Sequence, residues 1–433
     1  MAAHLLCKAS HQGVRFATVE FSGIRHIHAT AVPRQGRTLR EQAEEVLHRL
    51  DVAFRAQLAR GLVIEQTVFL AKPTQLDECR QVVGRFYGAD LPATSYLPQP
   101  PCDGSLLAIE AQAVARGGSK LEIERPSDQL VLLRQDGLCW AYCTPAVPGN
   151  STQGVYEETA CMLGRIQSLL QEGGFRFDQV LRPWLYLGGI VAAEGPTQRY
   201  KELNRARADF YRDISFLADY PREPRSGPIF PASTGIGTEG RQLHASALAL
   251  ASHRGDVIAR PLENPRQTAA YDYSRTYSPQ SPRFSRALAV ACGSASIIFI
   301  SGTASITHSE SRHPGDALAQ THETLDNIEA LISEANLARH DLPGFGSSLE
   351  GLGVARVYVK RPEDYPIIRE ACTQRLGDLP ITYTLADVCR PELLVEIEGI
   401  AFSRREPVSS TSAPRGPHFR DLAPRPTVAA ARR

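Results

Sequence analysis

The chain has 433 residues, of which 42% are hydrophobic and 22% are charged, and this composition excludes wholesale disorder, a collagen-like helix and a coiled-coil rod. A length of 433 residues exceeds what one hydrophobic core usually supports, so two or three compact units are expected. The 48 Lys and Arg residues against 47 Asp and Glu residues give a net charge of +1, which leaves no global field to hold a nucleic acid or an anionic membrane.

The sequence lacks the signals of a secreted or membrane-spanning protein. No uninterrupted apolar stretch of about eighteen residues occurs, and the N-terminal sequence MAAHLLCKASHQ has no apolar core of a signal peptide. The nine Cys residues are scattered without CxxC pairs, which favours reduced thiols. We therefore expect a cytoplasmic protein that binds no membrane.

One order of elements occurs three times along the chain, which indicates an internal repeat. Each copy has an amphipathic helix, a short strand with an aromatic residue at its third position, a second helix, a Pro-x-Ser/Thr sequence and a closing apolar strand. In the first copy these elements are expected around 47–54, 67–70, 74–87, 92–94 and 106–115. In the second they are expected around 163–170, 184–187, 197–213, 231–233 and 243–251. In the third they are expected around 325–332, 356–359, 362–376, 380–382 and 393–401.

This order of elements is typical of an α+β fold in which helices cover one face of a mixed sheet. A sheet that is covered on one side must still bury its other face, so we expect three units to pack sheet to sheet around a pseudo-threefold axis. The expected product is a monomeric pseudo-trimer with mixed sheets inside and helices outside. The units are expected at 1–120, 129–252 and 285–402, and residues 403–433 have too little apolar content to fold, so a disordered tail is expected there.

The closing strand of the third copy carries the strongest candidate for chemistry. Because side chains alternate along a strand, Glu396 and Glu398 share one face with Leu394. A carboxyl group on such an apolar strand would have a raised pKa and could donate a proton near neutral pH. The alternative is that both acids face solvent on an edge strand, which is the commoner place for Glu.

Two pairs of residues could clamp an anion. Tyr200 and Arg207 are seven residues apart on a predicted helix, so they lie nearly in line, and Tyr273 and Arg286 flank a Pro-rich turn. The alternative for Tyr200 and Arg207 is a solvated helix face, and the alternative for Tyr273 and Arg286 is packing of the loop. Gly302 could let a ligand approach the backbone, or it could be an ordinary turn glycine. We expect no metal site, because His308 and His313 have no third ligand at a suitable spacing.

Three segments carry a resemblance to a known family: PASTGIG at 231–237, FISGTASITHSESRHPGDALAQTHETLDNIEALI at 299–332 and YTLADVCRPELLVEIEGIA at 383–401. They resemble the chorismatase family, whose members cleave chorismate and have the YjgF/RidA fold, also called chorismate-mutase-like. The resemblance is strong over 181–402 and weaker over 129–180. The first 115 residues resemble only a generic YjgF/RidA unit.

The resemblance implies removal of pyruvate from chorismate without a cofactor or a metal. It places the acid that protonates the enolpyruvyl methylene at Glu396, and it places substrate-binding side chains at Tyr200, Arg207, Tyr273 and Arg286. A Gly in the SGTAS strand together with a Cys seven residues before the acid is associated with 3-hydroxybenzoate formation. That pair is Gly302 and Cys389 here, so we expect 3-hydroxybenzoate and pyruvate as products.

Two other functions remain open from the sequence. One is an enamine or imine deaminase of the YjgF/RidA kind, an activity that the resemblance associates with an Arg on the Pro-x-Thr strand. This chain has Tyr383 at that position, and Tyr383 is a further candidate for substrate contact. A non-catalytic pseudo-trimer that binds a small ligand is the other alternative. It predicts a solvent-exposed Glu396 and no deep pocket beside it.

Overall fold

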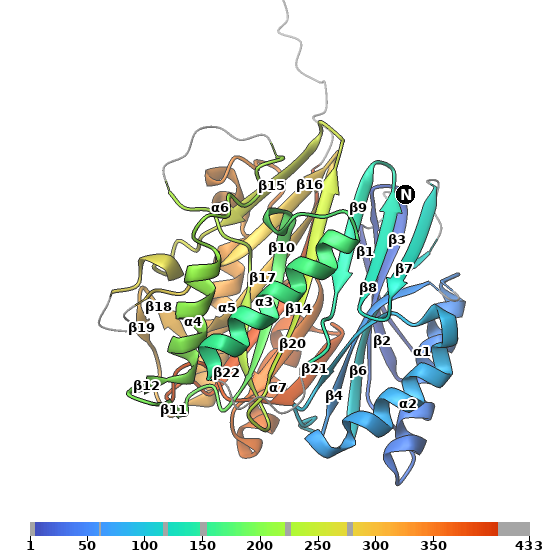
Figure 1. Ribbon diagram of the computed structural model, residues 1–433. Helices are drawn as coiled ribbons and strands as arrows, with labels where there is room; N and C mark the ends of the chain where they lie inside the picture. The colour runs from blue at the N-terminus through green and yellow to red at the C-terminus, as the bar shows by residue number, and fades with distance from the viewer. Residues whose placement is uncertain are drawn as a thin grey trace, which may run out of the picture.

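The computed structural model describes residues 5–59, 62–115, 120–147, 154–220, 227–274 and 280–405. Within these residues the chain forms three six-stranded mixed sheets with the same strand order (Figure 1). In each sheet the first three strands in sequence are followed in space by the last strand, which pairs with the fourth, and the fifth lies parallel to the fourth at the edge. We call these sheets and their helices the first, second and third unit.

The first unit opens the chain. Its elements are β1 (Leu6–His11), β2 (Val14–Phe21), β3 (Ile24–Ala31), α1 (Leu39–Ala56), β4 (Val63–Leu70), α2 (Leu76–Tyr87), β5 (Ala93–Leu97) and β6 (Leu107–Ala115). Helix α1 begins at a capping box, in which the Thr38 hydroxyl accepts from the backbone N–H of Glu41 and the Glu41 carboxylate accepts from that of Thr38. The apolar face of α1 packs on the outer face of the sheet.

The second unit repeats this order. Its elements are β7 (Leu121–Ser127), β8 (Leu130–Gln135), β9 (Leu138–Cys143), α3 (Val155–Glu172), β10 (Val180–Gly188), α4 (Arg199–Phe210), β13 (Thr234–Thr238) and β14 (Leu243–Ser252). A short two-stranded ribbon, β11 (Ala193–Glu194) with β12 (Thr197–Gln198), leads into α4.

The third unit completes the described chain. Its elements are β15 (Val257–Leu262), β16 (Ala287–Cys292), β17 (Ala295–Ala304), α5 (Ala317–Ile332), α6 (Glu334–Arg339), β20 (Leu352–Val359), α7 (Tyr365–Leu376), β21 (Ile381–Leu385) and β22 (Val395–Arg404). A second ribbon joins β18 (Ile306–Thr307) to β19 (Glu310–Ser311). The side chain of Asp316, expected from the sequence as a helix cap, accepts from Ala319 N at the start of α5.

Two strands lie in segments that the sequence analysis did not assign to a unit. Strand β7 precedes the expected start at residue 129, and β15 precedes the expected start at residue 285. Both are edge strands, and each contains a proline, Pro126 or Pro261. Proline is tolerated in edge strands, so a polar or charged segment that contains Pro can be an edge strand although its sequence suggests a linker.

The three sheets pack together in the centre and the helices lie outside them (Figure 1), so the predicted α+β pseudo-trimer is confirmed. One core cluster joins residues of all three units. The ring of Trp140 in the second unit packs edge to face against Phe21 of the first and Phe299 of the third, with both pairs of ring centroids 6.4 Å apart.

The predicted tail at 403–433 lies outside the described residues, except that Ser403 and Arg404 end β22 and Arg405 follows them. None of the described helices has both the length and the apolar character needed to cross a lipid bilayer.

Candidate active site

A cavity of about 520 Å³ lies at the boundary between the second and third units. The second unit contributes side chains from α4 and β13, and the third contributes residues of β17, β22 and the loops beside them. The lining residues that matter for chemistry are Tyr200, Lys201, Asn204, Ser233, Tyr273, Arg286, Gly302, Cys389, Arg390, Glu392 and Glu396. One wall therefore comes from each unit, and neither unit could form this cavity alone.

Glu396 is the second residue of the mostly apolar strand β22, and it lines the cavity. It sits on β22 opposite Tyr358 of β20, and its residue is 4% exposed. Burial, together with the smaller effect of the Glu398 charge and partly opposed by Arg286, raises the pKa of Glu396 to about 8. The carboxyl group is therefore protonated near neutral pH and can donate that proton into the cavity.

Gly302 provides the space that the Glu396 carboxyl occupies. A break in register between β17 and β22 brings the glycine next to the acid, and a Cβ atom built on Gly302 would lie 2.1 Å from Glu396 Oε1. The same Cβ would lie 3.0 Å from the Thr234 methyl carbon, and Gly302 N donates to Thr234 Oγ1 at 2.9 Å. Any side chain larger than hydrogen would have to move the acid.

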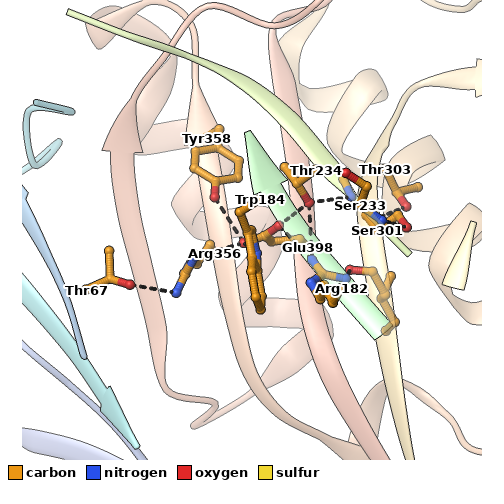
Figure 2. Close-up of polar contacts among 12 residues, drawn as sticks. Thr67, Arg182, Trp184, Ser233, Thr234, Ser301, Thr303, Arg356, Tyr358 and Glu398 are labelled. Carbon is orange, nitrogen blue, oxygen red and sulfur yellow. Dashed lines mark hydrogen bonds and ion pairs between the residues drawn. The ribbon is translucent and has the colours of Figure 1, made fainter. Parts of the chain in front are cut away.

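Glu398 lies two residues further along the same face of β22, and its pKa is shifted in the opposite direction. Its carboxylate accepts from Arg182 Nη2 at 2.8 Å, Trp184 Nε1 at 3.1 Å, Arg356 Nη1 at 3.2 Å, Tyr358 Oη at 3.0 Å and Thr234 Oγ1 (Figure 2). Burial would raise the pKa of Glu398, but Arg182, Arg356 and the two hydroxyl donors lower it. Glu398 is therefore an ionised structural carboxylate. The alternative that both acids face solvent is wrong, since Glu398 is 3% exposed.

The two predicted clamp pairs lie on opposite sides of the cavity, but only three of their four residues line it. Tyr200 lines it from α4, while Arg207 lies behind that wall and donates to Asn204 Oδ1 at 2.6 Å and Ser233 Oγ at 3.4 Å. On the other wall, Arg286 Nη2 donates to Tyr273 Oη at 2.5 Å. Arg286 thus presents its charge to the cavity directly, and Arg207 acts through the residues that it holds.

Cys389 lines the cavity as a packed thiol. Burial, with a smaller contribution from the charge of Glu396, raises the pKa of Cys389 to about 12. A thiol with this pKa is neither a nucleophile nor an anion near neutral pH, so its contribution is its shape.

Tyr383 does not line the cavity, and the expectation that it contacts a substrate there does not fit the structure. Its ring packs edge to face against Tyr365 of α7, with centroids 5.5 Å apart, on the outer face of the third sheet. Side chains alternate along β21, so the neighbouring Thr382 and Thr384 face inward and are buried in its place. The main chain of this strand instead seals the boundary with the first unit, where Cys102 N donates to Tyr383 O at 3.1 Å.

Sequence reasoning missed a second cation in the cavity. Arg390 follows Cys389 directly, its Nη1 donates to Ser309 O at 2.9 Å, and its guanidinium lies 5.3 Å from the centre of the Tyr273 ring. Its position next to a residue already singled out was the available signal. Lys201 lines the cavity beside Tyr200 and was also missed. Among the described residues no three His, Cys, Asp or Glu side chains are grouped so that they could hold a metal ion.

The three-unit fold and a buried, protonated carboxyl group beside arginines define an enzyme whose site lies between two repeats. The chain is 37% identical over 279 residues to a 3-hydroxybenzoate synthase from Streptomyces hygroscopicus, which covers 61% of this chain and 76% of the relative. It is 33% identical over 278 residues to a chorismatase from Streptomyces rapamycinicus, which covers 61% and 77%.

The chain belongs to the chorismatase family and is similar to its 3-hydroxybenzoate-forming subtype. A crystal structure of a chorismatase has the same fold, with a TM-score of 0.62 and 22% identity over 86% of this chain and 98% of that one. No protein-family model matches the chain. Membership in this family confirms that the protein is an enzyme and confirms the resemblance read from residues 231–237, 299–332 and 383–401.

Proposed function

We propose that the protein cleaves the enolpyruvyl ether of chorismate and releases pyruvate and 3-hydroxybenzoate. The observation that carries this proposal is the protonated carboxyl group of Glu396, which faces the same cavity as the Arg286 guanidinium. An enol ether is cleaved by protonation of its terminal carbon, and a buried carboxyl group with a pKa near 8 is suited to that task. The relatives named above support the substrate.

The charges of the cavity fit a small dianion such as chorismate. Arg286 and Arg390 line the wall of the third unit, and Lys201 lines that of the second, so two separated carboxylates can each meet a cation. Tyr200 and Tyr273 offer phenol groups beside these cations. A volume of about 520 Å³ is within the range of pockets that enclose small ligands.

In the proposed reaction the Glu396 proton adds to the terminal methylene carbon of the enolpyruvyl group, which leaves a positive charge on the ether carbon. The bond between the ring carbon and the ether oxygen then breaks, its electron pair stays on that oxygen, and pyruvate leaves. The neighbouring ring hydroxyl oxygen bonds to the vacated ring carbon and returns its proton to Glu396. The bond between this oxygen and its original ring carbon then breaks, the vacated carbon loses its hydrogen as a proton, the oxygen gains a proton, and the product is an aromatic phenol. No water is consumed.

Gly302 and Cys389 are proposed to favour this internal path over attack by water. Water attack on the positive ether carbon would give pyruvate and a dihydroxycyclohexadiene carboxylate instead. Gly302 lets the acid approach the β17 backbone closely, and the neutral Cys389 thiol fills the wall beside it. Together they set where the proton donor stands relative to the ring hydroxyl.

The two alternative functions receive less support. The proposed deaminase clamp would need a cation on the Pro-x-Thr strand, but Tyr383 stands there and its side chain points to the outer face of the sheet. A non-catalytic ligand-binding protein was expected to expose Glu396 and to lack a deep pocket. The 4% exposure of Glu396 and the cavity beside it disagree with both expectations.

The proposal is tested by incubating the purified full-length protein with chorismate. We expect pyruvate, measured by its reduction with lactate dehydrogenase and NADH, and an equal amount of 3-hydroxybenzoate, measured by liquid chromatography. Spontaneous decay of chorismate in buffer is the control. Pyruvate formation at that background rate would overturn the proposed function, and pyruvate without 3-hydroxybenzoate would overturn the proposed product.

Gly302→Ala combined with Cys389→Val is expected to lower 3-hydroxybenzoate formation and divert product toward the dihydroxycyclohexadiene carboxylate. The alanine methyl would occupy space 2.1 Å from Glu396 Oε1, so the acid must shift. Displacement of a catalytic group on this scale costs about tenfold or more in rate. Chromatography of both products gives the ratio. Gly164→Ala is the matched control, since an added Cβ there meets nothing within 4 Å. An unchanged product ratio in the double variant would show that these positions do not steer the ring chemistry.

A further inference from the structure

A second cavity, of about 270 Å³, lies at the boundary between the first and second units. It is the pseudo-symmetric counterpart of the candidate active site. In the third unit Glu396 of β22 lies opposite Tyr358 of β20, and in the second unit His244 of β14 lies opposite Tyr186 of β10 in the same way. His244 therefore holds the position of the catalytic acid in this second cavity, which it lines.

The other wall also corresponds. In the active site it is formed by α4 and β13 of the second unit, and in the second cavity it is formed by α2 and β5 of the first. Tyr96 of β5 pairs with Val68 as Gly235 of β13 pairs with Leu185, so a tyrosine ring stands where the active site has a glycine. This substitution accounts for the smaller volume of the second cavity.

The third boundary, between the first and third units, has a different residue at this position. There the position of the acid is taken by Ala108, which lies opposite Phe69. An isolated bridge between Pro101 and Thr384 joins the first unit to the third, and Leu385 N donates to Pro100 O at 2.8 Å. Backbone contacts of this kind also join the other two boundaries, where Gly237 N donates to Asp387 O and Glu239 N donates to Pro98 O, both at 2.8 Å. The boundaries differ in the side chain at the position of the acid, which is polar and buried at two of them and a methyl group at the third.

The polar groups of the second cavity are left with unused hydrogen-bonding capacity. His244 is 5% exposed, and no hydrogen bond between described residues involves its ring nitrogens. The buried hydroxyl of Thr144, on the same lining, also has none. Buried polar groups without partners are costly, so a ligand that supplies hydrogen bonds would be favoured here.

Charge decides the class of ligand. Arg80 lines the cavity with its guanidinium 5.4 Å from the centre of the Tyr96 ring, and its one ion pair within the described residues is a long contact of 3.9 Å with Asp77. Burial and the nearby Arg80 charge lower the pKa of His244 to about 4, so the imidazole is neutral. Asp128 on the lining offsets one positive charge and disfavours a ligand with two negative charges.

We infer that this second cavity binds a small monocarboxylate with an apolar body, whose carboxylate pairs with Arg80 and whose other end meets the His244 imidazole. Leu91, Leu97, Val147 and Ala245 provide the apolar lining for the body. A neutral imidazole has no proton to donate as a strong acid near neutral pH, so the cavity binds without performing the chemistry of its counterpart. This inference is independent of the proposed reaction.

The test uses sodium benzoate as the probe and the full-length protein, with binding measured by calorimetry. The Arg286→Gln background removes one of the two guanidinium groups of the active-site cavity. In this variant a saturable benzoate site that depends on Arg80 is expected to remain. Adding Arg80→Gln is expected to weaken that site by about tenfold or more, because a charged hydrogen-bond pair is lost. Arg85→Gln, on the same helix, is the matched control and is expected to leave binding unchanged.

The wild-type background provides a second measurement if Arg286→Gln does not fold. There, Arg80→Gln is expected to remove one benzoate site per chain and to leave pyruvate release from chorismate unchanged, so failure here is separate from failure of the proposed function. Absence of any saturable benzoate site, or a site that Arg80→Gln and Arg85→Gln affect equally, would overturn the inference.

Discussion

Glu396→Gln is expected to reduce pyruvate release from chorismate by at least about a hundredfold, which is the lower end of what general acid catalysis contributes. The amide has nearly the shape of the protonated carboxyl group but cannot donate a proton of comparable acidity. The rate is measured as kcat with the coupled pyruvate assay, and the fold is checked by circular dichroism. Glu370→Gln on the outer helix α7 is the matched control. Undiminished kcat would remove Glu396 from the role of acid.

The same variant has a second, independent signature in its stability. The pKa of Glu396 is about 8 in the folded protein and near 4.3 in an unfolded chain, so folding between these pH values takes up a proton. The wild type therefore loses about 1.4 kcal/mol of stability per pH unit across this window from this group, and the Gln variant does not. Urea unfolding is expected to show the variant gaining stability over wild type as pH rises toward 8. A parallel pH dependence of the two proteins would contradict a buried acid.

Glu398→Gln is expected to destabilise the protein strongly, by about 3–5 kcal/mol, because removing one partner of a buried ion pair leaves the opposite charge uncompensated. Arg182, which is 1% exposed, loses its carboxylate partner, and Arg356, which is 7% exposed, keeps only Glu110 of its two carboxylate partners. The free energy of unfolding in urea measures this loss. Glu310→Gln, an acid exposed on β19, is the control and is expected to change stability little. Near-wild-type stability of Glu398→Gln would mean that the charge cluster carries little of the fold.

Glu398→Gln also changes the pH dependence of catalysis. Activity is expected to be full below about pH 8 and to fall above it, since the acid must be protonated. The Glu398 charge contributes to that raised pKa, so its removal is expected to move the fall in kcat/KM to lower pH. Glu110→Gln is the matched control, because Glu110 pairs with Arg356 from the first unit and is not among the charges that raise the pKa of Glu396. Superimposable profiles for Glu398→Gln and wild type would show that Glu398 has no such influence.

The sequence was sufficient to predict the architecture, because helix periodicity and the strand aromatics repeat three times. The strand aromatics Phe69, Tyr186 and Tyr358 occupy equivalent positions in their sheets, and they lie opposite Ala108, His244 and Glu396 respectively. The edge strands β7 and β15 were not predicted. An edge strand pairs on one side only, so its sequence can contain proline and charged residues.

The site could be predicted only where it depends on the alternation of side chains along a single strand. The pattern of β22 correctly placed Glu396 and Glu398 on one face, but their opposite ionisation depends on partners more than 150 residues away, such as Arg182 and Thr234. No spacing in the sequence reveals those contacts. Tyr383 was misplaced for the same reason, because which face of an edge strand meets the neighbouring unit is decided by tertiary packing.

The charge cluster around Arg356 joins side chains of all three units, which has a consequence for dividing the protein into fragments. Arg356 of the third unit donates to Glu110 and Thr67 of the first and to Tyr186 of the second, as well as to Glu398. Fragments that encode the repeats one at a time would each expose an inner sheet face with solitary ionic side chains on it. Such fragments are expected to be insoluble when produced alone and to become soluble only when all three are produced together.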